Sequence, residues 1–211
     1  MRNMAERTYR WLFWVLAVGG TLLDQATKYG VYRWLYHGSR EGTWPANPRI
    51  FWLHANYNLD PEAHYSGPLA RLAELNGPVP PYLNPGALFG LGQGYNGLFS
   101  VISVLAAVGI IAWVCRRSAA RDWVLCTSLG LILAGTLGNL YDRVVFSGVR
   151  DFLHFQVVGV IDWPIFNLAD SCLVCGALLL LLQAFWTRSP APAPQAAAGA
   201  RAPELAAAKK D

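Results

Sequence analysis

Two aspartates in the second half of this 211-residue chain have the residue type and the surroundings for acid–base chemistry. Asp151 follows an apolar run that ends in GNLYDR, and Asp170 directly precedes an uncharged segment that extends to Trp186. Two carboxyl groups facing each other in a poorly hydrated site cannot easily both ionise, so one keeps a proton while the other stays charged. Such a pair can activate water, because the charged member removes a proton from it while the other protonates the scissile carbonyl oxygen. The two residues therefore suit hydrolysis without a metal or a nucleophilic side chain.

Other hydrolytic chemistries have no matching pattern. The sequence contains no H-E-x-x-H zinc motif and no G-x-S-x-G nucleophile motif. None of the four histidines lies in an apolar segment, where it would be needed to activate a serine or cysteine nucleophile. Cys172 and Cys175 form a C-x-x-C within an apolar run, where we interpret them as small apolar side chains. The sequence therefore shows neither a recognised metal-ligand spacing nor a nucleophile motif.

The composition is that of a membrane protein. Apolar residues make up 54% of the chain and charged residues 14%, whereas charged residues usually make up about 25% of a soluble domain. A helix that crosses a bilayer needs about 20 mostly apolar residues. Four segments meet this length, and they cover residues 11–36, 98–115, 123–146 and 164–186. We predict an all-α integral membrane protein in which residues 1–189 form one domain with four transmembrane helices.

Two further stretches lie outside these helices. Residues 38–96 are rich in Pro, Gly, Asn and aromatic residues, and the piece RIFWLHANY predicts a small extracytoplasmic β element between the first two helices. Residues 190–211 are rich in Ala and Pro and predict a disordered tail. Basic residues gather before the first helix, between the second and third, and after the fourth, which places both termini in the cytoplasm. This placement at segment ends indicates membrane orientation and not nucleic-acid binding.

The polar residues of these segments fall at one depth. With a rise of about 1.5 Å per residue, Asp170 lies about 27 Å from the cytoplasmic end of its helix, and Asp24 lies about 21 Å from its own. Both are in the outer half of a hydrocarbon layer about 30 Å thick. Other polar residues reach the same side: Asn84, Asn139, Asp142, Arg143 and Asp151. Since an ionisable residue in a spanning helix is by default a functional candidate, we expect a site near the outer face.

Several of these residues have a structural alternative. Asp24 and Lys28 are four residues apart on one helix and can pair with each other. Asp142 and Arg143 can be charges at the end of a helix, and Asn139 can cap a helix or bridge two helices. These alternatives stay open at the level of the sequence.

Asp151 and Asp170 have no cation four residues away on a helix, so a structural role explains them less well. Arg150 adjoins Asp151 but does not have to point the same way. We interpret Asp162 and His154 as solvated loop residues. A small proton-coupled transporter could use the same two carboxylates as a relay. Few polar residues continue into the cytoplasmic half of the helices, which favours hydrolysis.

Five short motifs make the chain resemble the lipoprotein signal peptidases, also called signal peptidase II. They are DQATK (24–28), NPGALFG (84–90), GNLYDR (138–143), GVRDF (148–152) and FNLAD (166–170), and they occur in the order of the family. The resemblance implies an aspartic endopeptidase in the bacterial inner membrane. Such an enzyme removes the signal peptide from prolipoproteins, cutting before a cysteine that bears a diacylglyceryl group. The resemblance further implies surrounding membrane lipid, no cofactor and inhibition by the cyclic peptide globomycin, and we expect a monomer.

The resemblance also implies roles for single residues. It makes Asp151 and Asp170 the catalytic pair. It implies substrate-binding or supporting roles for seven others, which are Asp24, Lys28, Asn84, Asn139, Asp142, Arg143 and Asn167. The chain departs from the family pattern at Pro85 and Leu88, and its 38–82 stretch is longer than is typical. An inactive relative that binds lipoproteins without cutting them is a third hypothesis, against which the presence of both aspartates argues.

Overall fold

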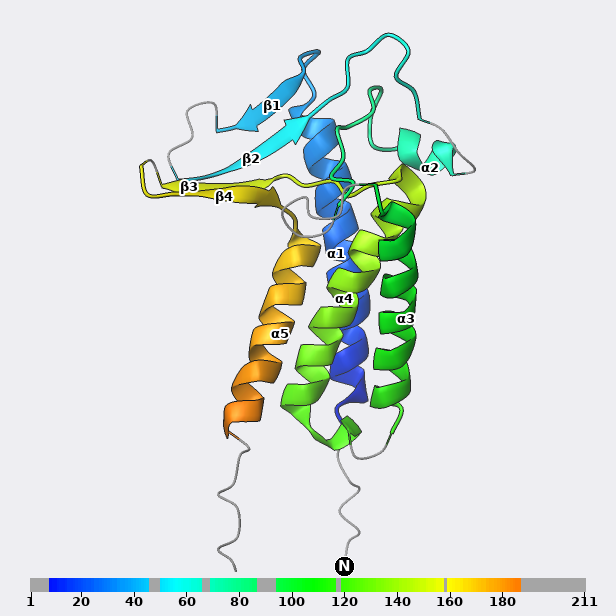
Figure 1. Cartoon of the computed structure of the whole chain (residues 1–211), viewed down its shortest axis with the longest axis vertical. Helices are drawn as coiled ribbons and strands as arrows, with labels where there is room; N and C mark the ends of the chain where they lie inside the picture. Colours follow the sequence, from blue (N-terminus) through cyan, green and yellow to red (C-terminus); the bar gives the residue numbers. More distant parts are fainter. Residues whose placement is uncertain are drawn as a thin grey trace, which may run out of the picture.

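The computed structural model describes residues 8–45, 50–65, 69–86, 94–116, 119–157 and 159–186, and the structural statements below concern these residues. The tail predicted at 190–211 lies outside them, as does part of the motif at 84–90. A bundle of long helices carries a small antiparallel sheet at one end (Figure 1).

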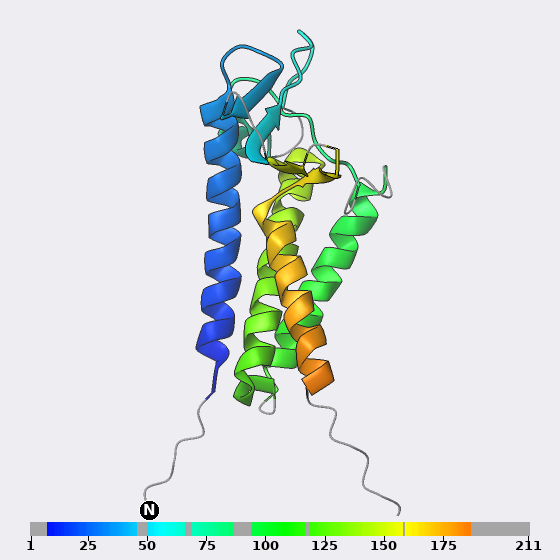
Figure 2. The same cartoon turned by 90° about the vertical axis from the view of Figure 1, so that its left-hand side faces the viewer.

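Four long helices form the bundle: α1 (Arg10–Leu35), α3 (Asn96–Val114), α4 (Trp123–Phe146) and α5 (Leu168–Trp186). Helix α4 packs against each of the other three, and α1 also contacts α5. At the start of α4, the carboxylate of Asp122 accepts a hydrogen bond from the backbone N–H of Leu125, as an N-cap does. The chain begins α1 and ends α5 at the end of the bundle away from the sheet (Figure 1, Figure 2).

Three of these helices, α3, α4 and α5, are long and apolar enough to cross a membrane. Helix α1 is longer still at 26 residues, but it carries Asp24, Lys28 and Arg33 in its second half. Among the described residues, length and composition therefore mark three spans and not the predicted four. Helix α1 remains the fourth long helix of the same bundle.

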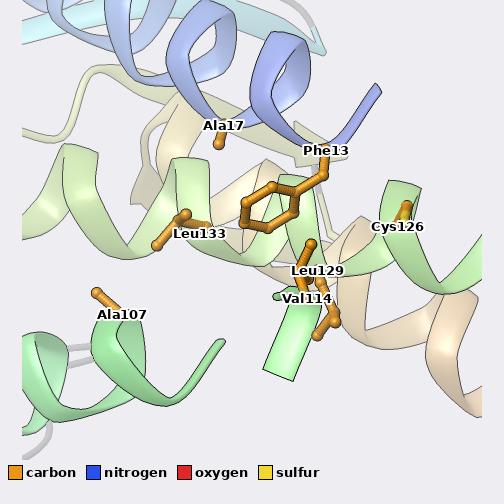
Figure 3. Packing of buried hydrophobic residues seen from close by; sticks show 7 residues of the cluster. All are labelled: Phe13, Ala17, Ala107, Val114, Cys126, Leu129 and Leu133. Atoms are coloured by element: carbon orange, nitrogen blue, oxygen red, sulfur yellow. The ribbon is translucent and has the colours of Figure 1, made fainter. Parts of the chain in front are cut away.

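Small residues on α4 allow its neighbours to approach closely. A Cβ atom on Gly138 would lie 2.6 Å from Oδ2 of Asp24 in α1, and one on Gly135 would collide with the backbone oxygen of Ala169 in α5. Away from the sheet, one apolar cluster joins α1, α3 and α4. Figure 3 shows Phe13 of α1 directed towards Leu129 and Leu133 of α4, with the other members around them (Phe13, Ala17, Ala107, Val114, Cys126, Leu129 and Leu133).

The sheet has four strands in the order β1-β2-β3-β4, all antiparallel. Strands β1 (Glu41–Trp44) and β2 (Phe51–Asn56) come from the predicted β element. Strands β3 (Leu153–Val157) and β4 (Ile161–Phe166) come from the connection between α4 and α5, where no strand is predicted.

The predicted start of the last helix at Pro164 is therefore wrong. Pro164 lies in β4, and α5 begins only at Leu168. Apart from Asp162 the segment IDWPIF is apolar, so its composition did not distinguish a strand from a helix. Because β4 is an edge strand, it tolerates a proline that cannot donate a backbone hydrogen bond.

Another part of the 38–96 insert packs against the sheet end of α4. A short helix, α2 (Ala70–Glu74), buries Ala73 against Val145 and Phe146 of α4. At the opposite end of the bundle, a 3-10 turn, η2 (Ala119–Arg121), joins α3 to α4. The insert thus contacts the helix that leads directly into the loop carrying Asp151.

Candidate active site

Asp151 and Asp170 line the same cavity, which has a volume of about 170 Å³ and lies at the sheet end of the bundle. Asp151 lies between α4 and β3, and Asp170 lies in the first turn of α5. Three more of the predicted site residues line this cavity, namely Asn84, Asn139 and Arg143. Apolar side chains of α3 and α5, including Phe99, Ile102 and Leu173, form part of the rest of its wall, together with Val149 and with Ile165 and Phe166 of β4.

Asp170 is fixed by the start of its own helix. The side chain of Asn167 accepts a hydrogen bond from the backbone N–H of Asp170 at 3.0 Å, and Oδ2 of Asp170 accepts one from the backbone N–H of Asn167 at 3.2 Å. This reciprocal arrangement is a capping box, with Asn167 as the cap and the acid three residues later. Nδ2 of Asn139 donates to the remaining oxygen of Asp170 at 2.8 Å. The carboxylate is therefore held at both oxygens.

Asp151 is held by amide groups from two different segments. Nδ2 of Asn167 donates to Oδ1 of Asp151 at 2.7 Å, and Nδ2 of Asn84 donates to Oδ2 at 3.1 Å. The backbone of Asn84 is itself paired with Val149 through two hydrogen bonds, at 2.8 and 2.9 Å. The hydroxyl of Tyr32 donates to the backbone oxygen of Asp151 at 2.9 Å. Each side-chain oxygen of Asp151 thus accepts one amide hydrogen.

A chain of amides links the two acids. Nδ2 of Asn167, which donates to Asp151, also donates to Oδ1 of Asn139 at 3.2 Å, and Asn139 in turn donates to Asp170. Burial and, next, the charge of Asp170 raise the pKa of the Asp151 carboxyl to about 7. The amide hydrogen bonds from Asn84 and Asn167 oppose this rise. Near neutral pH the pair can therefore retain one proton, as paired carboxyls in a poorly hydrated site do.

Behind the cavity lies a buried cluster of charges. Nζ of Lys28 lies 2.9 Å from Asp24 and 3.3 Å from Asp142, and Asp142 forms a second ion pair, at 2.7 Å, with Arg150. The side chains of all four residues are at most 1% exposed. Asp24 and Lys28 therefore do pair with each other, and Asp142 is a buried ion-pair partner of Lys28 and Arg150.

The cluster also contacts the residues that hold the two acids. Nζ of Lys28 donates to Oδ1 of Asn139 at 3.3 Å. Oδ1 of Asp24 accepts the backbone N–H of Ala169, in the first turn of α5, at 2.9 Å. The nine predicted site residues therefore form one continuous group, with six at or beside the cavity and Asp24, Lys28 and Asp142 behind it.

Three members of this group were not predicted from the sequence. Arg150 is fully buried and bonds to Asn76 and Gln25, each at 2.7 Å. Gln25 and Arg150 stand inside two of the quoted motifs, which was the signal that could have singled them out. Asn76 lies in the insert and carries no such signal.

His154 and Asp162 lie apart from the cavity. They pair across β3 and β4 at 2.8 Å, and the ring of His154 packs on Trp52. Asp162 is exposed, as predicted, but His154 is partly buried, so its interpretation as a solvated residue was wrong. In the part of the chain that the structure describes, no three His, Cys, Asp or Glu side chains are grouped so that they could hold a metal ion.

Comparison with known proteins identifies the family. Residues 79–186 match the family described as signal peptidase (SPase) II. A lipoprotein signal peptidase of Rhodopirellula baltica is 37% identical over 185 residues, which cover 82% of this chain and 71% of the relative. The chain belongs to the signal peptidase II family. The matched range contains Asp151 and Asp170, and membership confirms the resemblance carried by the five motifs.

Further matches agree with this assignment. A lipoprotein signal peptidase of Geobacillus thermodenitrificans is 38% identical over 107 residues, which cover 51% of this chain and 66% of the relative, slightly less than two thirds of its length. A solved structure described as a bacterial membrane enzyme superposes with a TM-score of 0.65 at 23% identity, over 90% of this chain and 99% of that one. This likeness shows the fold. Membership in the family makes the chain a peptidase, and the family and the apolar helices together indicate a bacterial membrane protein.

Proposed function

We propose that the chain removes the signal peptide from prolipoproteins whose cysteine bears a diacylglyceryl group, by activating water between Asp151 and Asp170. One observation carries the proposal: two acids from separate elements line one cavity and are linked through Asn139 and Asn167. Membership in the signal peptidase II family supplies the reaction class and the kind of substrate. It gives no support to the alternative of a proton-coupled transporter.

The chemistry follows from the unequal settings of the two acids. Because burial raises the pKa of Asp151 to about 7, we assign Asp151 as the acid that holds the shared proton and Asp170 as the base. Asp170 takes a proton from water as the water oxygen bonds to the scissile carbonyl carbon, and Asp151 protonates the carbonyl oxygen. The tetrahedral intermediate collapses when its C–N bond breaks and Asp170 returns the proton to the leaving amine. Asp151 then recovers its proton from the hydroxyl group that becomes the new carbonyl.

The substrate can reach this cavity from the side. Helices α3 and α5 both pack on α4, and most residues of each lie on the surface of the bundle. Their side chains Phe99, Ile102 and Leu173 form the apolar wall of the cavity. An apolar signal segment and the acyl chains of the substrate would stay in lipid against these faces, while the peptide bond before the lipidated cysteine enters the cavity.

The orientation in the membrane is part of the proposal. We take α1 as the fourth span, because it runs the length of the bundle beside α4 (Figure 2). Asp24 and Lys28 in its second half are buried and pair with each other and with Asp142 of α4, so these charges do not face lipid, and Arg33 lies in its last turn, near the sheet. With an even number of spans both ends of the bundle domain lie on one side, which we assign to the cytoplasm. The sheet and the cavity then face outward.

Cleavage of a diacylglyceryl-modified precursor by the purified protein tests the proposal. Asp151→Asn and Asp170→Asn should each abolish cleavage while leaving the amount of folded protein unchanged, and globomycin should inhibit the wild type. Asp162→Asn is the matched control, since Asp162 is exposed and does not line the cavity. Full activity in either cavity variant would refute the mechanism. If the wild type binds the precursor without cutting it, the chain is an inactive relative.

A further inference from the structure

Arg150 is the largest fully buried side chain among the described residues. Its guanidinium group lies 4.3 Å from the ring centroid of Tyr29 in α1 and 4.0 Å from that of Phe146 in α4. A planar guanidinium group can stack on aromatic faces, and the compact ammonium group of lysine does not reproduce this contact.

The hydrogen bonds of Arg150 join three segments of the chain. Its Nε and Nη2 donate to the two carboxylate oxygens of Asp142 at 3.2 and 2.7 Å. Nη1 donates to Oδ1 of Asn76 in the insert, and Nη2 also donates to Oε1 of Gln25 in α1. The backbone N–H of Arg150 donates to Oδ2 of Asp142 at 2.9 Å. Backbone and side chain are thus fixed on one carboxylate, immediately before Asp151.

We propose that Arg150 is a positioning residue that sets the place of the Asp151 carboxylate opposite Asp170, and that the insert takes part through Asn76. This inference rests on the proposed function. The residue touches no reacting atom and acts through the backbone of the loop. That loop is also tied at Asn84 through Val149 and at Tyr32 through the Asp151 carbonyl, and loss of the Arg150 side chain removes its attachments to Asn76, to Gln25 and to the carboxylate of Asp142.

The charge of Arg150 has a second effect on the pair of acids. Two cations and two anions make the buried cluster neutral: Lys28 and Arg150 against Asp24 and Asp142. The other charged groups around the pair are Arg143, which lines the cavity, and the two acids themselves. Replacing Arg150 by a neutral residue leaves the cluster with one net negative charge. A negative charge nearby makes the pair hold its proton more tightly, so the proton is lost at a higher pH.

Steady-state kinetics on Arg150→Lys and Arg150→Gln tests the inference. In both variants, kcat should fall by about tenfold to a hundredfold with little change in KM, because the reacting groups are misplaced while binding persists. The alkaline limb of the pH profile should stay in place for Arg150→Lys and move up by about half a pH unit or more for Arg150→Gln. Arg71→Gln is the matched control, because Arg71 is exposed on α2.

Asn76→Ala separates the contribution of the insert. It removes one neutral partner of Arg150 and should lower kcat several-fold without shifting the pH profile, because no charge changes. The kcat of each variant is calculated per folded molecule, and thermal unfolding curves give the folded fraction. If Arg150→Gln leaves kcat and the alkaline limb as in the wild type and lowers only the yield of folded protein, Arg150 is a structural residue and the inference is overturned.

A measurement without substrate distinguishes this inference from the proposed function. Because the pKa of Asp151 is raised in the folded state, the unfolding temperature of the wild type falls relative to Asp151→Asn as pH rises from about 4, and the difference levels off above about 7. In the Arg150→Gln background this levelling off should occur at higher pH. If this pH does not change, the effect of the Arg150 charge on the two acids is refuted, even if the wild type cleaves no precursor. If the wild type cleaves no precursor, only the proposed function is refuted.

Discussion

Replacement of Lys28 by methionine tests how much the buried charge cluster contributes to the stability of the fold. Nζ of Lys28 lies 2.9 Å from Asp24, 3.3 Å from Asp142 and 3.3 Å from Oδ1 of Asn139, and its side chain is 0% exposed. Methionine fills a similar volume but removes the cation. Asp24 and Asp142 then remain buried, and Arg150 is the remaining cation of the cluster.

The expected loss follows from the cost of an unpaired buried charge. Removing one partner of a buried ion pair costs about 3–5 kcal/mol, because the remaining charge is left without compensation. For a chain of this length, each kcal/mol lowers the unfolding midpoint by about 2–4 °C. We therefore expect Lys28→Met to lower that midpoint by at least about 6 °C. Asp24→Asn in the same molecule restores neutrality and keeps Oδ1 as the acceptor for Ala169.

Thermal unfolding in detergent, followed by intrinsic tryptophan fluorescence, measures these differences. The double variant should recover about 2 kcal/mol of the loss, which is the coupling expected between residues in direct contact. Arg33→Met is the matched control, since Arg33 is exposed on the same helix, and its midpoint should change little. A Lys28→Met midpoint within 2 °C of the control, or strictly additive effects of the two substitutions, would show that the cluster is not held by charge pairing as argued.

Three further predictions concern the site. Since the pKa of Asp151 is raised to about 7, kcat should fall about tenfold per pH unit above this pH as the shared proton is lost; an alkaline limb that begins only above about pH 9 would contradict the assignment. Gly138→Ala should lower both stability and activity, because its Cβ would lie 2.6 Å from Oδ2 of Asp24, whereas Gly109→Ala on α3 meets no atom within 4 Å and should be neutral by the same thermal melts. Tyr32→Phe removes the hydrogen bond to the Asp151 carbonyl and should cost about 1 kcal/mol and lower kcat several-fold, and an unchanged kcat would exclude this contact from positioning the loop.

The sequence predicted a helix best where a polar capping residue directly precedes an apolar run. The run 123–146 coincides with α4, since Asp122 caps its start. The last helix was predicted four residues too early, because the apolar segment before Asn167 has no period that separates a strand from a helix. Its strand conformation depends on pairing with β3, which is a tertiary contact. The capping box of Asn167 and Asp170 was a local signal for the true start.

The site was predictable as a set of residues but not as a network. Depth along the helices grouped the acids correctly, because helical rise is a local property. The bonds of Arg150 to Asn76 and to Gln25 join residues 74 and 125 positions apart, and nothing in the surrounding sequence indicates such partners. The insert is therefore the part of the molecule whose contribution to the site only the fold reveals.

The i,i+4 spacing of Asp24 and Lys28 has a consequence for helix α1 while the rest of the protein is still being synthesised. Helix α1 leaves the ribosome long before Asp142, Arg150 and Ala169, which later complete the contacts of its polar residues. Until then, the one partner of opposite charge within reach of each of these two side chains is the other, and their pairing masks two charges that lipid would reject. The nascent helix can thus stay in the bilayer with these two charges paired within the helix. When α4 and α5 have been synthesised, Asp24 and Lys28 add contacts with these helices to this pairing.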